Sequence, residues 1–425
     1  MARIKSLIIH FKDEYFRHTF YIYVFSLLSG AAGYFFQVLL GARLSRPDYG
    51  LFNSVLSGTV VAGAVIDIFR PWMTGYFSRL HRENVNVLPL AMKFMRYLAV
   101  LGLPLFLAVL FGASYLRMFF RTDLLLVPFV FLALILASTI PSPLYSLYES
   151  QRLFLEISAS GFLGPALKLG ITFLLFFYTC SLAPVFVIYT AAAYILPVIL
   201  FFLLPRYFPG SGNTVLTAPP EFFNKNNLYS FLKILTGIIA FRVIFEIDMV
   251  MVRYFFSEDV SGDYAAVSRV GKILYFLASM SLPVFYSSSL HSLKEGRAGQ
   301  KIFFKGLLIV SMVSLPAFAV LYTGAPFFLD LFLPNYRDSL PLMRIYLVLS
   351  LPYIYIQFMI HLLMVVGRWR IFAVSFAGVF LQIILIINFH GSLRSILYIN
   401  ASIGFFMFVC YTTYLLVKRK TLFCG

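Results

Sequence analysis

Six basic residues lie inside long apolar stretches of the sequence, where a charged side chain is unfavourable unless it meets a partner or water. Arginine and lysine in such positions can bind an anionic group, and arginine can hold a phosphate through two parallel hydrogen bonds. The chemistry that these residues could support is therefore the binding of a phosphate-containing ligand. The six residues are Lys168, Lys233, Arg242, Arg269, Lys272 and Arg344.

Lys168 lies near the middle of its apolar stretch, about 22 Å along a helix that starts at Leu153. A lysine side chain does not easily reach the membrane surface from that depth. We expect Lys168 to face a cavity and bind an anion. The alternative is a fixed ion pair with a buried acid such as Glu156 or Asp67.

Arg269 and Lys272 are three residues apart and therefore share one face of a helix. Two like charges within a membrane are unfavourable unless an anion or a water-filled cavity lies beside them. We expect a second anion site here. The alternative is a helix that begins later along the chain, which would leave both residues near the outer membrane surface.

Arg242 is also near the middle of a stretch, and Glu246 follows it by one helical turn, so the two side chains can form an ion pair. That pair is either a fixed internal contact or one that opens and closes while the protein works. Asp248 is rotated by about 160° from Glu246 around the helix and faces elsewhere. Asp248 is a candidate for binding a cation.

Arg70 precedes Pro71 at the predicted inner end of the second stretch. It either meets a phosphate that enters from the cytoplasm or helps to set the orientation of the chain. Asp67, just before it, is a candidate for an ion pair or for ion coupling. Lys233 and Arg344 lie near the ends of their stretches, where their charged groups can reach the membrane surface.

The composition predicts the elements that position these residues. Of 425 residues, 61% are hydrophobic and only 12% are charged, which excludes a water-soluble fold. A membrane-spanning helix needs about 20 apolar residues, so the chain has room for about twelve. The predicted spans are 19–42, 49–69, 88–112, 123–147, 153–177, 182–204, 228–254, 262–287, 302–325, 340–366, 370–390 and 394–417.

The basic residues also predict the orientation. If the N-terminus is cytoplasmic, the inner segments carry about three times as many arginines and lysines as the outer ones. The net charge of +17 therefore indicates membrane topology, and nucleic acid is not an expected partner. The longest polar connection divides the chain into an N-terminal six-helix lobe at 1–205, a cytoplasmic linker at 206–227 and a C-terminal six-helix lobe at 228–425.

The sequence lacks the motifs of several common kinds of catalysis. The sequence has no phosphate-binding Gly-Lys-Ser/Thr loop, no His-Glu-x-x-His and no Gly-x-Ser-x-Gly. Its three cysteines, Cys180, Cys410 and Cys424, have no metal-ligand spacing. No cofactor, metal ion or catalytic residue is expected, and the protein is not expected to be an enzyme.

A short motif occurs twice, half a chain apart. Arg43 is followed by an acidic turn and by Gly50-Leu-Phe, and Arg253 is followed by an acidic turn and by Gly262-Asp-Tyr. Each copy follows the first span of a six-span half, and both halves enter the membrane from the same side. The pattern predicts a parallel repeat, which is one of the known designs of secondary transporters.

These residues resemble a known family. The segments Gly41-Ala-Arg-Leu-Ser-Arg-Pro-Asp-Tyr-Gly-Leu-Phe52 and Phe245-Glu-Ile-Asp248 with Gly262-Asp-Tyr264 are similar to the polysaccharide-transport branch of the multidrug/oligosaccharidyl-lipid/polysaccharide exporter superfamily. The resemblance implies two six-helix lobes around a central cavity that work by alternating access. Relatives often have a glycine two residues after the acid that ends the second span. In this sequence that acid is Asp67, and Phe69 stands at the position of the glycine.

The resemblance implies a flippase that moves an undecaprenyl-pyrophosphate-linked oligosaccharide, such as an O-antigen unit, to the outer leaflet of the bacterial cytoplasmic membrane. Expected partners are that lipid-linked oligosaccharide, membrane lipids, a coupling cation (H⁺ or Na⁺) and polysaccharide-assembly proteins, and the expected state is a monomer with both termini cytoplasmic. The main alternative is a cation-coupled multidrug antiporter, which should have an acidic cavity. A membrane polysaccharide polymerase is the third hypothesis; the longest predicted outer loop, 325–340, is short for it.

Overall fold

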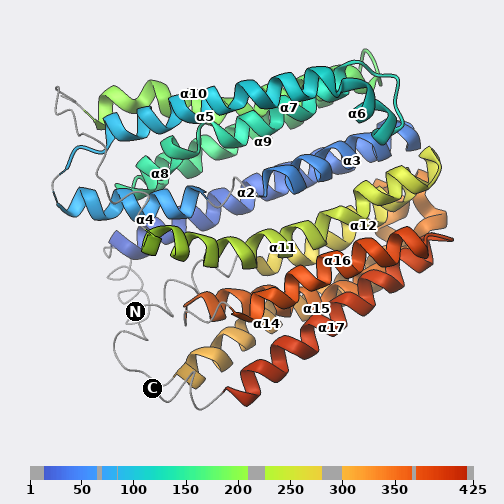
Figure 1. Ribbon diagram of the computed structural model, residues 1–425. Coiled ribbons are helices and arrows are strands. Elements are labelled where there is room, and N and C mark those ends of the chain that lie inside the picture. Colours follow the sequence, from blue (N-terminus) through green and yellow to red (C-terminus); the bar gives the residue numbers. More distant parts are fainter. Residues whose placement is uncertain are drawn as a thin grey trace, which may run out of the picture. The chain divides into compact units, whose positions relative to one another are not determined.

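The chain is an all-α polytopic membrane protein. A computed structural model describes residues 14–64, 69–83, 85–208, 225–279, 299–365 and 370–418, and no strand occurs in these ranges (Figure 1). Within them, nine helical segments are long and apolar enough to cross a membrane. They match nine of the twelve predicted spans.

The other three predicted spans also form helices, but these helices are more polar. They are α3 (Arg46–Gly63), α11 (Lys225–Phe255) and α12 (Glu258–Ser279). Helix α3 buries the polar side chains of Asn53, Ser54 and Ser57, and α11 and α12 carry the charged residues singled out above. Polar side chains within the membrane need partners, so these three helices are expected to pack inside the protein.

The helices divide into two compact units. The first comprises Met1–Gln37, Val65–Leu116 and Leu124–Asn227. In this unit α9 packs on α10, α4 packs on α8, and α5 packs on α7 and α8. Its helices are most of α2 (Glu14–Arg43), α4 (Phe69–Arg82), α5 (Leu88–Phe111), the start of α6 (Ala113–Phe120), α7 (Leu126–Thr139), α8 (Ser142–Ser150), α9 (Phe154–Leu175) and α10 (Leu182–Tyr207).

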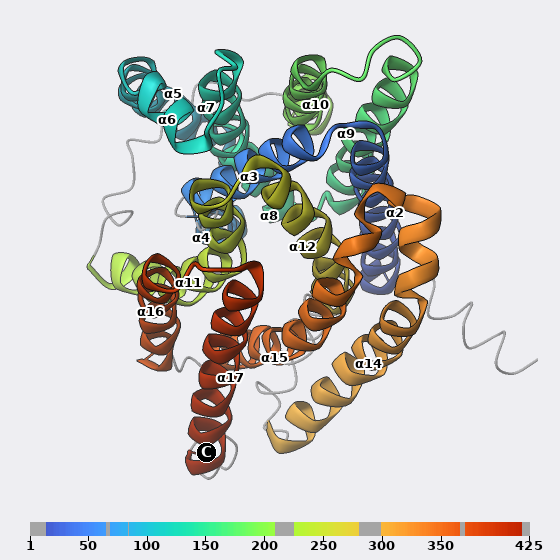
Figure 2. The same ribbon diagram turned by 90° about the vertical axis from the view of Figure 1, so that its right-hand side faces the viewer.

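The second unit comprises Val38–Ala64, Arg117–Asp123 and Leu228–Gly425. Helix α12 lies at its centre, between α3 on one side and α14 and α15 on the other, and α17 packs on α15 and α16 (Figure 2). Besides α3, α11 and α12, the unit contains α14 (Gly299–Phe332), η1 (Pro334–Ser339), α15 (Leu340–Val365), η2 (Arg370–Phe372), α16 (Ala373–Asn388) and α17 (Leu393–Val417).

Two segments of the predicted N-terminal lobe, 38–64 and 117–123, thus pack in the second unit. A buried arginine explains the second of these. The side chain of Arg253 is only 2% exposed, and its guanidinium donates hydrogen bonds of 2.8 Å to the carbonyl oxygens of both Phe120 and Arg121. These bonds satisfy donors that would otherwise be buried without partners. The division into two six-helix lobes stays a prediction.

Local sequence signals explain where the helices of the site begin and end. Ser45 caps α3 because its hydroxyl accepts a hydrogen bond from the backbone N–H of Asp48, and Pro47 occupies the first turn. The fourth predicted span is broken into α7 and α8 around Pro141, as its prolines suggest.

One predicted boundary is wrong. The segment 325–340, expected as a loop, is largely helical, since α14 continues to Phe332 and η1 follows it. Pro326 lies inside α14 without ending it. Membrane helices tolerate proline because neighbouring groups satisfy the freed carbonyl. The apolar residues after Pro326 continue the helix, with Leu329 buried and Phe327 and Leu331 exposed.

Candidate functional site

The candidate site begins with a very close contact between α3 and α12. A Cβ atom on Gly50 would lie only 2.7 Å from the backbone nitrogen of Gly262, and a Cβ atom on Gly262 would collide with the carbonyl group of Arg46. These are the glycines of the two repeat copies. Small residues allow helix backbones to approach closely in a membrane, so side chains from the two helices come within hydrogen-bonding distance.

Arg269 and Lys272 of α12 meet one carboxylate, that of Glu246 on α11. The Nζ atom of Lys272 lies 2.8 Å from Oε2 of Glu246, and Nη2 of Arg269 lies 4.0 Å from the same oxygen. The hydroxyl of Ser57 on α3 donates a hydrogen bond of 2.6 Å to that oxygen as well. The two basic side chains thus reach the same carboxylate, and the anion site predicted for them stays a prediction.

Arg269 is also bound to α3. Its Nε atom donates a hydrogen bond of 2.6 Å to Oδ1 of Asn53, and its Nη2 atom donates one of 3.2 Å to the hydroxyl of Ser57. Asn53 and Ser57 are both fully buried. We call the five side chains of Asn53, Ser57, Glu246, Arg269 and Lys272 the charged cluster.

The charged cluster lies well inside its helices. Helix α12 begins at Glu258, which places Arg269 about 16 Å along it. The helix therefore begins earlier than the predicted residue 262, and not later as the alternative required. Lys272 is 8% exposed. Two cations and one carboxylate give these five side chains a formal excess of one positive charge, and the buried carboxylate of Asp248 also acts electrostatically on Lys272.

A second polar group surrounds Asp248 on α11. Its carboxylate is 2% exposed. Oδ2 accepts hydrogen bonds of 2.6 Å from the hydroxyl of Tyr264 and 3.1 Å from the amide of Asn400, and Oδ1 accepts one of 2.7 Å from the backbone N–H of Met249. Asp248 and Glu246 thus have different partners, as their rotation around the helix predicts.

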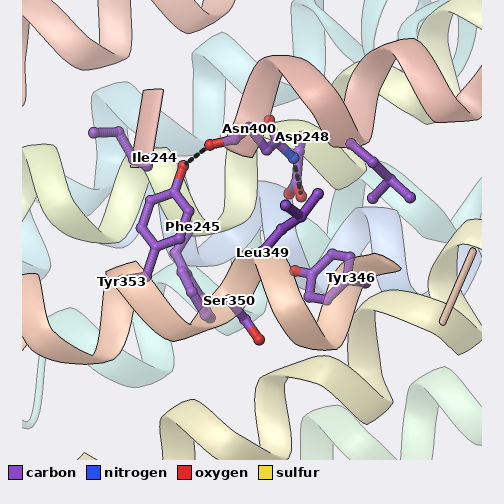
Figure 3. Close-up of a pocket in the computed structure, with 9 residues that line it drawn as sticks. Ile244, Phe245, Asp248, Tyr346, Leu349, Ser350, Tyr353 and Asn400 are labelled. Carbon is purple, nitrogen blue, oxygen red and sulfur yellow. Dashed lines mark hydrogen bonds between the residues drawn. The ribbon is translucent and has the colours of Figure 1, made fainter. Parts of the chain in front are cut away.

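Asp248 also lines a small pocket within the second unit (Figure 3). Asn400 connects its two sides: its amide donates to Asp248, and its backbone carbonyl accepts from the hydroxyl of Tyr353. A buried carboxylate beside the hydroxyl oxygens of the pocket is a donor set that suits a small cation, whereas the amide oxygen of Asn400 accepts a hydrogen bond from Gln382. The lining residues are Ile244, Phe245, Asp248, Tyr346, Leu349, Ser350, Tyr353, Leu397 and Asn400. In the described ranges no group of three or more His, Cys, Asp or Glu side chains could hold a metal ion.

Lys168 belongs to the first unit and has an aromatic environment. Its ammonium lies 4.8 Å from the ring centre of Phe36 and 4.4 Å from that of Tyr189. Such contacts stabilise a cation that is partly withdrawn from water. No carboxylate of the described residues forms an ion pair with it, which removes Glu156 as the expected partner. Asp67 lies outside the described residues.

Arg70, also in the first unit, is bound to an acid that the sequence did not suggest. Its Nε atom donates a hydrogen bond of 3.0 Å to Glu149, and its guanidinium lies 4.9 Å from the ring centre of Tyr145. The hydroxyl of Thr74 donates a further 2.8 Å hydrogen bond to Glu149. These contacts give Arg70 a role in joining α4 to α8. The predicted first contact with phosphate stays a prediction.

The remaining predicted residues differ in what surrounds them. Arg242 has an exposed side chain on α11, and its expected pair with Glu246 stays a prediction. The guanidinium of Arg344 lies 5.6 Å from the ring centre of Tyr322. Lys233 lies in α11, but its side chain is outside the described residues.

Sequence reasoning missed Asn53 and Ser57 as partners of the charged residues. A signal was present: they are spaced by one helical turn within an apolar stretch, and Gly50 and Ser54 repeat that spacing on a neighbouring row. Small and polar residues at this spacing are typical of helix contacts within membranes. Their partner helix could not be named, since it lies more than half a chain away.

The fold has counterparts among solved structures. A eukaryotic MATE transporter, AtDTX14, aligns with a TM-score of 0.66 over 94% of this chain and 95% of its own, at 14% identity. The lipid II flippase MurJ in an inward closed conformation aligns with a TM-score of 0.66 over 93% of this chain and 87% of its own, at 14% identity. An outward-facing multidrug resistance transporter of the MATE family and MOP superfamily gives 0.66 over 95% and 96%, at 14% identity.

The chain has the fold of these transporters. No protein-family model and no curated protein matches it in sequence. The fold is shared by a multidrug resistance MATE family transporter and by a lipid II flippase, so the fold alone does not identify the substrate. The choice depends on the side chains of the site.

Proposed function

We propose that the protein is a membrane transporter that flips a polyprenyl-pyrophosphate-linked oligosaccharide from the cytoplasmic to the outer leaflet by alternating access, for the biosynthesis of a cell-surface polysaccharide such as O-antigen. The observation that carries the proposal is the excess positive charge of the charged cluster, where Arg269 and Lys272 share the single carboxylate of Glu246. The fold shared with a lipid II flippase is consistent with it.

The chemistry of such a substrate explains why the charge matters. Moving a pyrophosphate group from water into the hydrocarbon core requires a large desolvation free energy. Fixed cations in a water-filled site lower this barrier to crossing. Arginine and lysine differ usefully here, because arginine forms directed pairs of hydrogen bonds and lysine acts as a compact charge. The polyprenyl chain can stay in the bilayer while the head group crosses. Lys168 and Arg242 are the further cations that we propose for the path.

The alternative is a cation-coupled multidrug antiporter, since MATE transporters share the fold equally well. A site for organic cations should carry excess negative charge. The charged cluster has the opposite sign, and Lys168 has no acidic partner among the described residues. The chemistry therefore favours an anionic substrate.

We also propose Asp248 as the site of a coupling cation, either H⁺ or Na⁺. Its buried carboxylate and the oxygen atoms around its pocket support this role. The protein would act as a monomer in the bacterial cytoplasmic membrane, with both termini cytoplasmic. Polysaccharide-assembly proteins are its proposed partners.

The proposed function can be tested in liposomes that contain a fluorescent polyprenyl-pyrophosphate oligosaccharide. The measurement is the rate at which substrate from the inner leaflet becomes accessible to an impermeant sugar-modifying enzyme outside. We expect the wild-type protein to accelerate this rate, and Arg269→Gln with Lys272→Gln to abolish the acceleration. The matched control is Arg337→Gln, because Arg337 is an exposed arginine of the same unit whose partner is Asp330.

Lys168→Ala and Arg242→Ala test the further cations in the same assay. Acceleration that survives the Arg269 and Lys272 substitutions would keep the function and refute the site. No acceleration by folded wild-type protein with several glycans would refute the function.

A further inference from the structure

Lys168 lies in a corner formed by two aromatic rings of the first unit. Its ammonium is 4.8 Å from the ring centre of Phe36 on α2 and 4.4 Å from that of Tyr189 on α10. The two ring centres are 5.8 Å apart. Each ring is thus closer to the ammonium than to the other ring. Both rings contact the same cation, and that cation belongs to the protein itself.

This corner has the composition of a site for an organic cation. The faces of aromatic rings attract organic cations as they attract an ammonium, and proteins that recognise quaternary ammonium groups use such rings. Among the described residues, none forms an ion pair or a hydrogen bond with the ammonium of Lys168, so the two rings are its main contacts. A lysine therefore stands where a cationic ligand would bind.

We propose that Lys168 occupies an aromatic cation site and thereby excludes organic cations from the first unit. Lys168 is then a residue that determines specificity, in addition to its proposed contact with the anionic substrate. The inference deepens the proposed function and rests on it for one point, namely why a site for cations should be blocked. The occupancy itself depends only on the contacts of the three side chains.

A tethered ammonium competes strongly with a free cation. Its own helix holds the side chain of Lys168 beside the rings, and tethering of this kind gives an effective concentration of about millimolar. Phe36 is fully buried, so another cation does not reach its ring in this arrangement. A free cation that displaced the ammonium would still meet repulsion from it, because the lysine stays attached nearby.

Removal of the lysine side chain would leave space at the rings. Lys168 and Tyr189 are both half-buried, so the corner is not closed on every side. Gly33 lies three residues before Phe36 and therefore on the same side of α2, and a Cβ atom on Gly33 would have no atom within 4 Å. An alanine at position 168 would thus uncover ring surface beside open space.

The test measures the binding of ethidium, an organic cation, to the purified protein by fluorescence anisotropy. We expect the Lys168→Ala variant to bind ethidium at least about fivefold more tightly than the wild-type protein, which is the order expected of a single cation–ring contact. Lys168→Arg should resemble the wild type, because a guanidinium can occupy the same rings. Phenanthridine, the parent ring system in its uncharged form, should show no such gain.

Further variants show whether the gained site is the aromatic corner. Tyr189→Leu and Phe36→Leu, each combined with Lys168→Ala, should remove the gain. Size-exclusion chromatography checks that each protein is folded, and Tyr189→Leu is the milder change because Tyr189 is only half-buried. The matched control is Lys93→Ala. The ammonium of Lys93 lies 5.8 Å from the ring centre of Tyr97 in the same unit, but both side chains are exposed, so the affinity for ethidium should not change.

Three results would overturn the inference. One is a folded Lys168→Ala protein that binds ethidium no better than the wild type. The second is an equal gain for phenanthridine, which would show that the variant has only an apolar hole. The third is a gain that survives Tyr189→Leu.

The binding of ethidium does not depend on flipping, so the two proposals fail separately. If the wild-type protein flips its lipid-linked substrate and Lys168→Ala gains no affinity for ethidium, this inference is wrong and the function stands. If the wild-type protein does not flip and Lys168→Ala gains the affinity through the two rings, the function is wrong and the occupied site stands.

Discussion

The charged residues of the site are held by partners on other helices, since Arg269 donates a hydrogen bond to Asn53 on α3 and Lys272 pairs with Glu246 on α11. Arg269 and Lys272 stand out because they lie on one helical face within an apolar stretch. Their partners Asn53 and Ser57 lie more than 200 residues earlier. The spacing of Glu246 suggested a pair with Arg242, one turn away, because spacing along a single helix reports only local neighbours. Contacts between helices depend on packing.

Glu246 should lower the affinity of the site for anions, because its carboxylate neutralises the charge of the cations that would bind them. Glu246→Gln removes this negative charge and keeps the shape of the side chain. We expect the affinity for geranylgeranyl pyrophosphate to rise by about tenfold, an effect well within the strength of a charge at this distance. Equilibrium dialysis measures it.

The control for Glu246 is Asp259→Asn, which removes an exposed carboxylate from the first turn of α12. It should leave the affinity unchanged. An equal or lower affinity in the Glu246→Gln variant, with the protein folded, would show that its carboxylate does not compete with the ligand.

Asp248 should affect coupling and leave anion binding intact. Asp248→Asn keeps a hydrogen-bonding side chain beside Tyr264 and Asn400 but removes the charge that would bind a cation. Flipping by the wild-type protein should respond to an imposed Na⁺ or pH gradient across the liposome, and flipping by the variant should not. Asp330→Asn, an exposed acid of the same unit, is the control. A variant that responds to the gradient like wild type rules out this role for Asp248.

At the scale of the element, apolar stretches predicted where helices occur, and caps and prolines explain several of their ends. Ser45 begins α3 and Pro141 separates α7 from α8. The end of α14 was missed, since the predicted span ends at residue 325 whereas the helix continues through Pro326 to Phe332. The contact of α3 with α12 could not be predicted, although both of its glycines belong to the recognised repeat. A repeat shows that two segments are alike, but it does not show that they touch.

That contact predicts the effect of a single methyl group. In the Gly262→Ala variant the new Cβ atom would meet the backbone carbonyl of Arg46, which cannot rotate away as a side chain could. Helix α3 must shift, so flipping should decline. Gly324→Ala on α14 is the control, because a Cβ atom there has no atom within 4 Å. Unchanged flipping in Gly262→Ala would mean that the close approach has no role in transport.

At the scale of the whole molecule, composition and charge distribution already predicted an all-α membrane protein, and the structure confirms that class. The similarity in fold to MATE transporters and to MurJ extends over more than nine-tenths of this chain. Neither the sequence nor the fold determines the substrate, because the same fold occurs in transporters of both kinds. The sign of the charge in the site is the feature that distinguishes an anionic from a cationic substrate. The residues that set this charge are Arg269, Lys272 and Glu246.

The most direct test of the central claim compares the two substrate classes in the same liposomes. One arm follows the flipping of a fluorescent polyprenyl-pyrophosphate oligosaccharide, and the other follows proton- or sodium-driven movement of ethidium, an organic cation. We expect flipping by wild-type protein that is lost with Arg269→Gln and Lys272→Gln, and no movement of ethidium. Ion-driven movement of ethidium without any flipping would refute the proposed substrate and assign the protein to cation export.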